Sequence, residues 1–531
     1  MNIVFMRHGE AVDNVKGVLS CKEVQCSALT EKGAVQVAES VRKLPRAIDK
    51  IYSSPLIRTL QTTKEVLRVL GEIEVKVDSR IREIDWGEFN GECNNSELDA
   101  VRTAQLQGDF FVRFGLYGDN KYSLESRLSD FLNDIQKHNF KNNTILVVSH
   151  GTVISFMKRI LGLRQSHAKK GEFELFEDVD FSRLDEYRKR LEDVKNSSIA
   201  NRLQLAKDTP SSTLRCTFMN LAEDFNNIEL SDDILAKVIG GYNDKLTLVA
   251  GGDVLKNNGL IVICLFKNMG NFIDKWFSHY VNLGARSFVF LDNNSTDDSV
   301  DKIDNLSRKY GVGADIWSVP IEYNCFRSCG WRQQIMDIYG TERWYLNVDS
   351  DELFVFSDTN LDIGEYVKHR LSRGITVVKS MMIDVYSNKP IFDNDNIEDF
   401  QFFDVCGYKK TSHDSYGERI YGGPRNRVFG IKPSLQKVPL LYYTGSEALV
   451  NDHFIIPWVK NPKAVSSVLL HYKFLPGSLK AYKEMAKSGI HWNHSKEYKR
   501  YIQLYKDNPQ ATFYLEGVSR PMKEFSLDYF I

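Results

Sequence analysis

The chain has 531 residues, which is too long for one compact unit and leads us to expect about three. Hydrophobic residues make up 42% of it and charged residues 26%, a composition typical of soluble globular proteins. The formal net charge is −1, so the chain as a whole has no charge excess that would attract nucleic acid, and we expect no nucleic-acid partner.

A short apolar run at the N-terminus predicts a buried parallel strand that ends in an Arg-His pair. The first ten residues are MNIVFMRHGE, so Arg7 and His8 directly follow the apolar stretch. Open α/β sheets place their ligand chemistry just beyond the carboxyl ends of such strands. His8 is therefore a candidate nucleophile toward phosphate esters.

Three later segments supply the other groups that a phosphate site needs. After the strand-like IDKIYSS, an amphipathic helix begins in SSPLIRTLQTT, where Arg58 is the candidate phosphate clamp and free backbone N–H groups favour an anion. The Gly-rich and charged segment RIREIDWGEFNG contains Glu83. A second apolar strand, TILVVS, ends before His150-Gly151, which repeats the arrangement around His8. Two strands are thus predicted to bring two histidines to one edge of a sheet.

These residues, in this order, resemble the histidine phosphatase superfamily, also called phosphoglycerate-mutase-like, over about residues 1–165. The resemblance implies an α/β sandwich in which His8 takes the phosphoryl group and Glu83 protonates the leaving oxygen. It also implies that this domain needs no metal. The residues that it places around the phosphate are Arg7, Asn14, Arg58, His150 and Gly151.

The stretch YSLESRLSDFL resembles a Glu-Ser helix start of the same family but lacks the preceding Gly. Glu125 is therefore a candidate site residue, with helix capping as the alternative. The short spacings from Arg58 to Glu83 and from Glu83 to His150 leave little room for the insertions typical of the mutases. We expect a phosphatase.

Residues 166–250 are predicted to form a helical connector. They include DVDFSRLDEYRKRLEDVKNSSIANRLQLAKD, in which Leu184, Tyr187, Leu191 and Val194 recur at helical spacing. One face of this helix is predicted to pack on a neighbouring domain. The alternative is a dimerising helix, which would make the protein a homo-oligomer.

A second α/β pattern begins at about residue 251, and we assign residues 251–480 to a further domain. The strand GLIVICLF, the helix-like NFIDKWFSHYVNLG and the strand RSFVFLD are typical of the βαβ opening of a nucleotide-binding sheet. The following turn, NNSTDD, places polar groups at the carboxyl end of a strand, where the base and ribose of a nucleotide can be hydrogen-bonded.

A later apolar strand, TERWYLNVDSDELFVF, is interrupted by Asp349-Ser350-Asp351. Carboxylates two residues apart at a strand end face the same way and would repel each other if buried without partners. A divalent cation between them and a diphosphate would resolve this conflict. We therefore expect Asp349 and Asp351 to bind Mn²⁺ or Mg²⁺.

The segments Lys267-Asn268, Trp276 and Ser295-Thr296-Asp297 resemble family 2-type glycosyltransferases of the Rossmann-like GT-A fold, over about residues 255–480. The resemblance implies that Asp292 contacts the nucleotide and that the metal stabilises the departing nucleoside diphosphate. It also implies that His471, in SSVLLHYKF, is a further metal ligand. The donor-binding residues that it implies are Lys267, Asn268, Asp292, Asn294, Asp297, Asp349, Arg425 and Arg427.

Two roles stay open in this domain. Arg425 and Arg427 are candidates for binding donor phosphates, and structural ion pairs are the alternative. Sugar transfer with inversion needs a base that takes the hydroxyl proton of the acceptor, for which the candidates are Glu447 and the pair Asp452-His453.

Residues 481–531 are rich in Lys, Tyr and Phe and are predicted to form a packed C-terminal helical appendage. Cover of an acceptor groove and contact with an anionic membrane surface are the alternatives. We recognise no signal peptide, no apolar run long enough to cross a bilayer, and no CxxC pair among the eight cysteines. We therefore expect a cytoplasmic protein with at most peripheral contact at the inner face of the membrane.

Together these expectations describe a bifunctional enzyme of surface-glycan or glycoconjugate biosynthesis. One domain would transfer a sugar from a nucleotide-sugar donor to a glycan, lipid-linked or phosphorylated sugar acceptor. The other would hydrolyse a phosphomonoester through a phosphohistidine. Two alternatives stay open: a small-metabolite or sugar-phosphate phosphatase with a nucleotide-sugar-binding regulatory half, and a glycosyltransferase with a non-catalytic phosphate-docking N-terminal domain.

Overall fold

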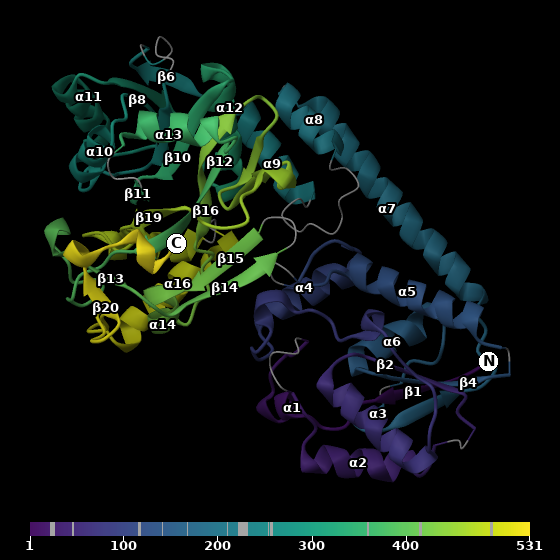
Figure 1. Cartoon of the computed structure of the whole chain (residues 1–531). Coiled ribbons are helices and arrows are strands. Elements are labelled where there is room, and N and C mark those ends of the chain that lie inside the picture. Colours follow the sequence, from purple (N-terminus) through teal and green to yellow (C-terminus); the bar gives the residue numbers. More distant parts are fainter. Residues whose placement is uncertain are drawn as a thin grey trace. The chain divides into compact units, whose positions relative to one another are not determined.

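The chain divides into two compact units, each with its own sheet (Figure 1). Of the described residues, those up to 201 belong to the first unit, and those in 202–220 and 232–531 belong to the second. The computed structural model describes residues 1–21, 27–44, 47–114, 118–140, 142–166, 168–209, 211–220, 232–252, 254, 259–357, 361–413, 417–488 and 492–531.

The described part of the first unit contains a five-stranded sheet in the order β3-β2-β4-β1-β5. Strands β1 to β4 are parallel, and β5 runs antiparallel beside β1. The strands are β1 (Asn2–Arg7), β2 (Lys50–Ser53), β3 (Val75–Val77), β4 (Thr144–Ser149) and β5 (Phe173–Phe176).

Helices cover both faces of this sheet (Figure 1). Val37 of α2 and Val66 of α3 pack in the apolar cluster on one face. Leu128 of α5 and Val153 of α6 pack in the cluster on the other face, which completes a three-layer α/β sandwich. The helices are α1 (Val12–Lys16), α2 (Glu31–Val41), α3 (Ile57–Leu70), α4 (Ser96–Leu106), α5 (Lys121–His138) and α6 (Gly151–Ile160).

The pairing of β1 with β4 determines where the two histidines lie. In this parallel pair Arg7 stands opposite Ser149, so both strands end at the same level. His8 and His150 are the next residues of their chains. The expected meeting of two histidines at one sheet edge therefore follows from the strand register.

The first unit extends beyond the predicted boundary at residue 165, because its sheet includes β5. Its Phe173 to Phe176 pair with β1, so the start of the expected connector belongs to this sheet. Within α7 (Ser182–Asp208), Leu184 is buried in the core of the first unit and Tyr187 packs against it. Residues 167, 210 and 221–231 of the expected connector lie outside the described residues.

The second unit is also mixed α/β, and its described residues form a nine-stranded sheet in the order β11-β19-β12-β16-β10-β7-β8-β9-β6. The neighbours β10, β7, β8 and β9 are parallel. The strands are β6 (Thr247–Ala250), β7 (Ile261–Phe266), β8 (Ser287–Asp292), β9 (Gly313–Ser318), β10 (Arg343–Asp349), β11 (Glu352–Phe356), β12 (Val377–Asp384), β16 (Gln436–Tyr443) and β19 (Ser467–His471).

The order of the parallel strands reverses at β7. The chain runs from β7 through β8 to β9, and α12 then returns it to β10 on the other side of β7. Ligand crevices of open α/β sheets form at such a reversal, here beyond Phe266 and Asp349. The helices of this unit before the C-terminal segment are α8 (Ser212–Asn220), α9 (Asp232–Asn243), α10 (Ile273–Asn282), α11 (Ser299–Tyr310), α12 (Cys325–Tyr339), α13 (Ile363–Ser372) and α14 (Gly423–Phe429).

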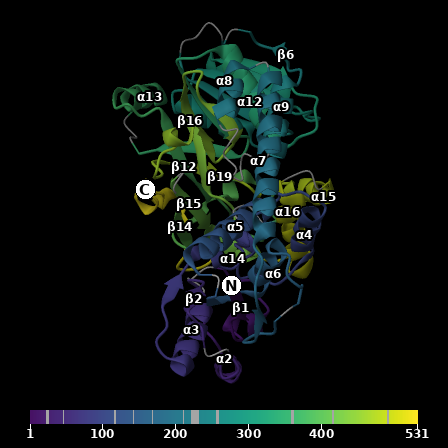
Figure 2. The ribbon, with the colours of Figure 1, turned by 90° about the vertical axis from the view of Figure 1, so that its right-hand side faces the viewer.

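The C-terminal segment is an integral part of the second unit and not only a helical appendage. Helices α15 (Ser478–Ser488) and α16 (Trp492–Asp507) lie side by side (Figure 2) and bury Tyr482 and Tyr501 in a cluster with Phe429 and Phe474. Beyond them a strand pairs back onto the preceding fold. The two-stranded pairs of this unit are β13 (Phe402–Asp404) with β20 (Ser519–Pro521), β14 (Tyr408–His413) with β15 (Gly417–Gly422), and β17 (Ala448–Asn451) with β18 (Phe454–Ile456).

Among the residues given above as described, no helix is both long enough and apolar enough to cross a membrane.

A close backbone contact joins α2 to the loop after β1. A Cβ atom at Gly33 would overlap the carbonyl oxygen of Glu10, and one at Gly9 would overlap the carbonyl oxygen of Gly33. Glycine at both positions therefore lets helix α2 lie directly against the loop that follows His8.

We predict that Gly33→Ala lowers the free energy of unfolding by about 1–3 kcal/mol, because the added methyl group forces the loop and helix apart. Thermal and urea denaturation of the full chain would measure the effect. Gly240→Ala, in helix α9, is the control, since its Cβ would meet no atom closer than one at 4.0 Å. That control should be neutral or stabilising by up to about 1 kcal/mol. Equal stability of Gly33→Ala and the parent chain would contradict the packing argument.

Candidate functional site

His8 is held in one tautomer by its two ring partners. It is 3% exposed, directly after β1, and its Nδ1 lies 2.7 Å from the carbonyl oxygen of Gly9. Because a carbonyl can only accept, Nδ1 carries the proton and donates to it. The Nε atom of Arg58 donates to His8 Nε2 over 3.2 Å, which requires a lone pair on Nε2. The nitrogen that bears the lone pair thus faces the cationic side of the site.

The environment of His8 favours its neutral form. Burial lowers the pKa of His8 well below its ordinary value of 6.5, and the charges of Arg58, Arg7 and Lys170 lower it further. The hydrogen bond to Gly9 opposes this shift but does not reverse it. His8 can therefore act as a nucleophile without first losing a proton near neutral pH.

Arg58 is fixed from three sides at the start of α3. It is 3% exposed, and besides its bond to His8 it donates from Nη2 to the carbonyl oxygen of Ser20 over 2.8 Å. Its Nη1 lies 3.6 Å from a carboxylate oxygen of Asp13, which is also buried. Asp13 was not predicted, because a single acid in a short loop gives no sequence signal for such a contact.

His150 adjoins His8, and Glu83 adjoins His150. The two imidazole rings lie 5.1 Å apart, and His150 Nε2 is 2.9 Å from the hydroxyl of Ser54. The Nδ1 atom of His150 lies 3.9 Å from Glu83 Oε2. Burial raises the pKa of Glu83 against the opposing charges of Arg58 and Arg7. A carboxyl with a raised pKa can donate a proton that an ordinary glutamate has already lost.

Arg7 has unused hydrogen-bonding capacity. Its Nη1 donates to the carbonyl oxygen of Ala168 over 3.4 Å, and its buried Nε has no partner among the described residues. A Cβ at position 151 would lie 3.0 Å from the guanidinium carbon of Arg7, so Gly151 allows this approach. Arg7 is thus available to a bound anion.

Two other predicted residues have partners of their own. Asn14, in α1, accepts a hydrogen bond from the N–H of Ala11, and among the described residues it makes no hydrogen bond to His8. Glu125 is fully buried on α5, where burial raises its pKa, and Asn120 caps the helix in its place. Helix capping by Glu125, the alternative reading of the sequence, is therefore wrong.

In the second unit, Asp349 is neutralised by cationic side chains. Its two carboxylate oxygens each lie 2.6 Å from a partner, one from Arg332 and the other from Lys437. Burial alone would raise the pKa of Asp349, but the charges of Lys437 and Arg332 lower it. The repulsion that the sequence argument assigned to a metal is thus already compensated at Asp349 by the protein itself.

Asp351 begins a chain of buried charged groups that ends on α16. Its Oδ2 lies 3.5 Å from His471 Nε2, and His471 Nδ1 lies 2.7 Å from an oxygen of Asp384. The other oxygen of Asp384 accepts a hydrogen bond from Arg425 over 2.9 Å. Arg425 continues to Glu497 over 3.0 Å. Glu497, which lies in the predicted C-terminal appendage, therefore supports His471 through Arg425 and Asp384.

The predicted donor loops meet at the reversal of strand order. Asn268 accepts a hydrogen bond from the Thr296 N–H over 2.7 Å, and its own N–H donates to the hydroxyl of Ser295 over 3.0 Å. Asp297 accepts from the Gly270 N–H over 3.1 Å. The structure therefore links the segment after β7, which begins with Lys267, to the segment after β8.

Other candidates in this region are arranged around the same loops. Asp292 accepts from the Ser295 N–H over 2.9 Å, and Asn294 adopts a left-handed backbone with φ of 60°. The indole N–H of Trp276 donates to the carbonyl oxygen of Asp349 over 3.2 Å. Arg427 donates to Asp404 over 2.9 Å and to the carbonyl oxygen of Phe513 over 2.7 Å. Arg427, like Arg425, thus takes part in a structural ion pair.

Of the candidate bases, Asp452 lies next to the Asp349 cluster. Arg332 bridges the two acids, with 2.8 Å between its Nη1 and Asp452. His453 donates from Nδ1 to the carbonyl oxygen of Gln436 over 2.6 Å. Glu447 is fully buried and bound instead to Lys460 and Thr444.

The three expected metal ligands are not brought together as one cluster. Within the described residues, no group of three or more His, Cys, Asp and Glu side chains could hold a metal ion. Asp349 is bound to Arg332 and Lys437, which leaves Asp351 and His471 as a pair. The sequence analysis missed the residues around these groups, because they are distant in sequence and form no local motif. They are Arg332 and Lys437 beside Asp349, and Asp384 and Glu497 in the chain of charged groups behind His471.

Comparison with known family models gives one match. The sequence model described as "Histidine phosphatase superfamily (branch 1)" matches residues 3–195. "Putative phosphoserine phosphatase 2" of Hydrogenobacter thermophilus is 31% identical over 159 residues, which are 28% of this chain and 72% of that protein. A 2,3-bisphosphoglycerate-dependent phosphoglycerate mutase of Thermoplasma acidophilum is 31% identical over 127 residues, covering 24% of this chain and 61% of the mutase. A glycosyltransferase family 92 protein of Ricinus communis is 25% identical over 126 residues, covering 23% of this chain and 22% of that protein.

We predict that Arg425→Met destabilises the chain by about 3–5 kcal/mol, because it removes the arginine that pairs with the buried carboxylate of Asp384. Urea denaturation of the full chain would measure this loss. Arg308→Met is the control, since its ion pair with Asp304 is largely exposed and should contribute at most about 1 kcal/mol. Similar losses of stability in the two variants would contradict a supporting role for the row of buried charged groups from Asp351 to Glu497.

Proposed function

The chain belongs to the histidine phosphatase superfamily (branch 1), and on that premise we propose that its N-terminal unit hydrolyses small phosphomonoesters through a phosphohistidine at His8. The observation that carries the proposal is the tautomer of His8, whose Nε2 lone pair is set by Gly9 on one side and Arg58 on the other. Phosphoserine is a first substrate to test, because a relative is named for it.

In the first step, Nε2 of His8 attacks phosphorus and the bond from phosphorus to the ester oxygen breaks. Glu83, whose pKa is raised by burial, gives its proton to the leaving oxygen, so the product departs as an alcohol. Arg7, Arg58 and His150 donate hydrogen bonds to the phosphoryl oxygens as their negative charge spreads.

In the second step, the Glu83 carboxylate takes a proton from a water molecule that attacks the phosphohistidine. The bond between nitrogen and phosphorus breaks, inorganic phosphate leaves, and both residues return to their starting states. We favour hydrolysis over mutase chemistry because the short spacings around Glu83 leave little room for the insertions typical of mutases.

We predict that His8→Ala abolishes phosphate release from every ester in a panel of phosphoserine, sugar phosphates and nucleotides. Glu83→Gln should retain the nucleophile but lose about 10²–10⁴ in rate, because the proton donor is gone. A colorimetric assay of released phosphate would measure both. Phosphate release by His8→Ala equal to that of the parent chain would contradict the proposal and leave a phosphate-docking domain as the better reading.

The pH dependence of kcat/KM tests the same two groups. His8 must be neutral, so activity falls on the acid side as pH drops through its lowered pKa, below 6.5. Glu83 must be protonated, so activity falls on the basic side as pH rises through its raised pKa, above 4.5. In Glu83→Gln the basic limb should disappear while the acid limb stays, which separates this role from general damage to the site.

We further propose that the second unit transfers a sugar from a nucleotide-sugar donor. This is supported by the meeting of the Lys267-Asn268 and Ser295-Thr296-Asp297 segments beside Asp349, at the point where strand order reverses. The relative from Ricinus communis is named for glycosyltransferase family 92, not family 2, so the proposal is the reaction class and not the family.

The donor set at Asp351 and His471 fits a divalent cation better than Asp349 does. His471 lies between Asp384 on Nδ1 and Asp351 on Nε2, and these two acids raise its pKa. A cation bound to Nε2 would replace the proton directed at Asp351, while Asp384 would hold the Nδ1–H, as carboxylates do for histidines that bind metals. When bound there, Mn²⁺ or Mg²⁺ supplies positive charge that stabilises a departing nucleoside diphosphate. Asp349, with its two cations, is better suited to hold Arg332 and Lys437 in place.

Two activities in one chain support a shared pathway, which we propose is the biosynthesis of a glycan or glycoconjugate. The acceptor would be a glycan, a lipid-linked sugar or a phosphorylated sugar, and the phosphatase would act on an acceptor, a product or a precursor. A nucleotide-sugar-binding regulatory unit remains the second candidate, because it uses the same donor residues without catalysis.

We predict Mn²⁺-dependent turnover of one nucleotide sugar that is lost in Asp351→Asn and unaffected by His8→Ala. Release of nucleoside diphosphate across a panel of nucleotide sugars would measure it, with phosphate release from phosphomonoesters as the matched control in each variant. Donor binding by calorimetry without turnover would favour the regulatory unit. Neither binding nor turnover of any nucleotide sugar would overturn the transferase proposal.

A further inference from the structure

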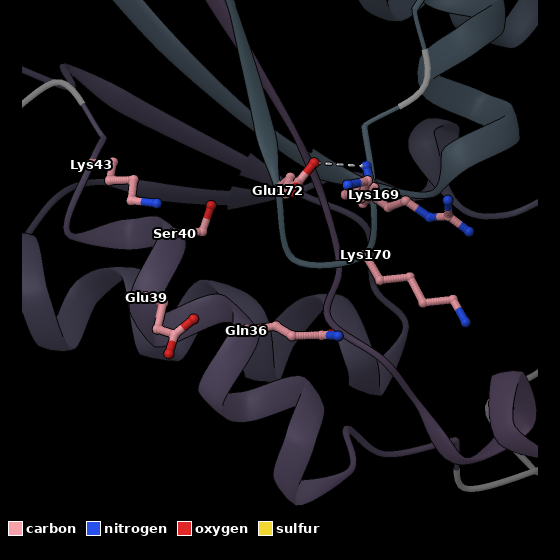
Figure 3. Close-up of a pocket in the computed structure, with 8 residues that line it drawn as sticks. Gln36, Glu39, Ser40, Lys43, Lys169, Lys170 and Glu172 are labelled. Atoms are coloured by element: carbon pink, nitrogen blue, oxygen red, sulfur yellow. Dashed lines mark hydrogen bonds between the residues drawn. The ribbon is translucent and has the colours of Figure 1, made fainter.

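A cavity of about 460 Å³ opens beside the catalytic strand, on the side of α2 (Figure 3). One wall is formed by α2 and the turn after it, and the facing wall by the segment that leads into β5. The mechanism proposed above uses only one of its lining residues, Arg7. The cavity is lined by Arg7, Gln36, Glu39, Ser40, Lys43, Lys169, Lys170 and Glu172.

Both walls are hydrogen-bonded to the backbone around the nucleophile. The Gly171 N–H donates to the carbonyl oxygens of Arg7 and His8, over 3.1 and 3.0 Å. On the other wall, the side-chain oxygen of Gln36 accepts from the Glu10 N–H over 3.1 Å. Gly171 has φ of 77°, and a Cβ there would lie 2.9 Å from Gln36 Cβ, so the walls meet closely at this point. The position of the cavity relative to His8 is therefore fixed.

The cavity carries an excess of positive charge. Four of its residues are cationic and two, Glu39 and Glu172, are acidic. Glu172 accepts a hydrogen bond from the backbone N–H of Lys169 over 3.2 Å, as drawn in Figure 3. No ion pair of the Lys43, Lys169 or Lys170 ammonium groups is found with any residue that the structure describes. These groups are thus available to an anion.

Lys170 is the lysine best placed to act together with the nucleophile. It is partly buried, whereas Lys43 and Lys169 are exposed. It also directly precedes Gly171, whose N–H donates to the carbonyl oxygen of His8. Its charge contributes to the low pKa of His8 and of Glu10, so it acts on the groups on both sides of Gly9. A partly buried ammonium is less screened by salt than one on an open surface.

We propose that this cavity is a subsite for a second anionic group, a carboxylate or phosphate, carried by the phosphomonoester substrate, with Lys170 as its main contact. The proposal rests on the phosphatase function and adds substrate selection to it. The transferred phosphoryl group is served by Arg7, Arg58 and His150, which leaves the lysines of the cavity for another acid group of the same molecule. Esters without such a group would lose this contact.

A matched pair of esters tests the subsite. O-Phosphoserine and O-phosphoethanolamine differ only by the carboxylate. Lys170→Gln should lower kcat/KM for phosphoserine about tenfold, mainly through KM, because one charge-assisted hydrogen bond is lost. Turnover of phosphoethanolamine, measured at a pH where His8 is neutral in both chains, should stay within about twofold. Lys137→Gln, an exposed lysine on α5, is the control and should leave both substrates unchanged. Equal losses for both esters in Lys170→Gln, or no loss for either, would overturn the proposal.

Added sulfate distinguishes a substrate group from a free anion. If the cavity holds the carboxylate of the substrate, sulfate should raise KM for phosphoserine more than for phosphoethanolamine, and Lys170→Gln should remove this difference. If Lys170→Gln instead changes only how sulfate affects phosphoethanolamine turnover, the cavity binds a free effector anion and the substrate subsite is overturned.

The subsite can also be tested if the phosphatase function fails. A parent chain that releases no phosphate from either ester would overturn the proposed function alone. Calorimetry would then compare the binding of phosphoserine to the parent chain and to Lys170→Gln. A Kd about tenfold weaker in the variant would support the subsite, and equal values would overturn it.

Discussion

The hydrogen bond from His8 Nδ1 to the carbonyl oxygen of Gly9 is the constraint on which the chemistry of the first unit depends. It fixes the proton on one ring nitrogen, so the other presents its lone pair toward Arg58. In water this preference would be weak, but His8 is almost fully buried and a change of protonation state there is costly. Burial and cationic neighbours act in the same direction, which allows an imidazole to be a neutral nucleophile among arginines. Under the same burial the pKa of Glu83 shifts in the opposite sense, upward, which suits the proton donor proposed for this site.

The surrounding fold maintains this geometry through backbone contacts. The register of β1 with β4 brings both histidines to one level, and the close approach of Gly9 to Gly33 holds the loop after His8 against α2. In the second unit the buried carboxylates are compensated by charged partners. Arg332 and Lys437 pair with Asp349, and acidic and basic groups alternate from Asp351 to Glu497. Buried charges are thus paired in both units, and the first also holds a histidine whose pKa is lowered beside Arg7, whose buried Nε has no partner among the described residues.

Much of the first unit could be predicted from sequence, because apolar runs followed by Arg-His or His-Gly are local signals for strand ends. Local signals could not reveal β5, a short strand that is stabilised only by pairing with β1, or β20, which pairs with the distant β13. The carboxylates of the Asp-Ser-Asp triplet were expected to receive compensating charge from a divalent cation, but at Asp349 that charge comes from two side chains of the protein. The source could not be predicted, since Arg332 and Lys437 reach Asp349 from other elements of the fold. Lys170 was missed for the same reason, because its nearness to His8 depends on β5.

The central claim is that His8 carries the phosphoryl group, and trapping that intermediate tests it most directly. The full chain would be mixed with ³²P-labelled phosphomonoester, quenched in alkali within milliseconds to seconds, and the protein-bound label mapped to a peptide. The account predicts an acid-labile, alkali-stable label on the peptide that contains His8, absent from His8→Ala and longer-lived in Glu83→Gln. Phosphate release at the parent rate with no protein-bound label, or with a label on another residue, would contradict the account.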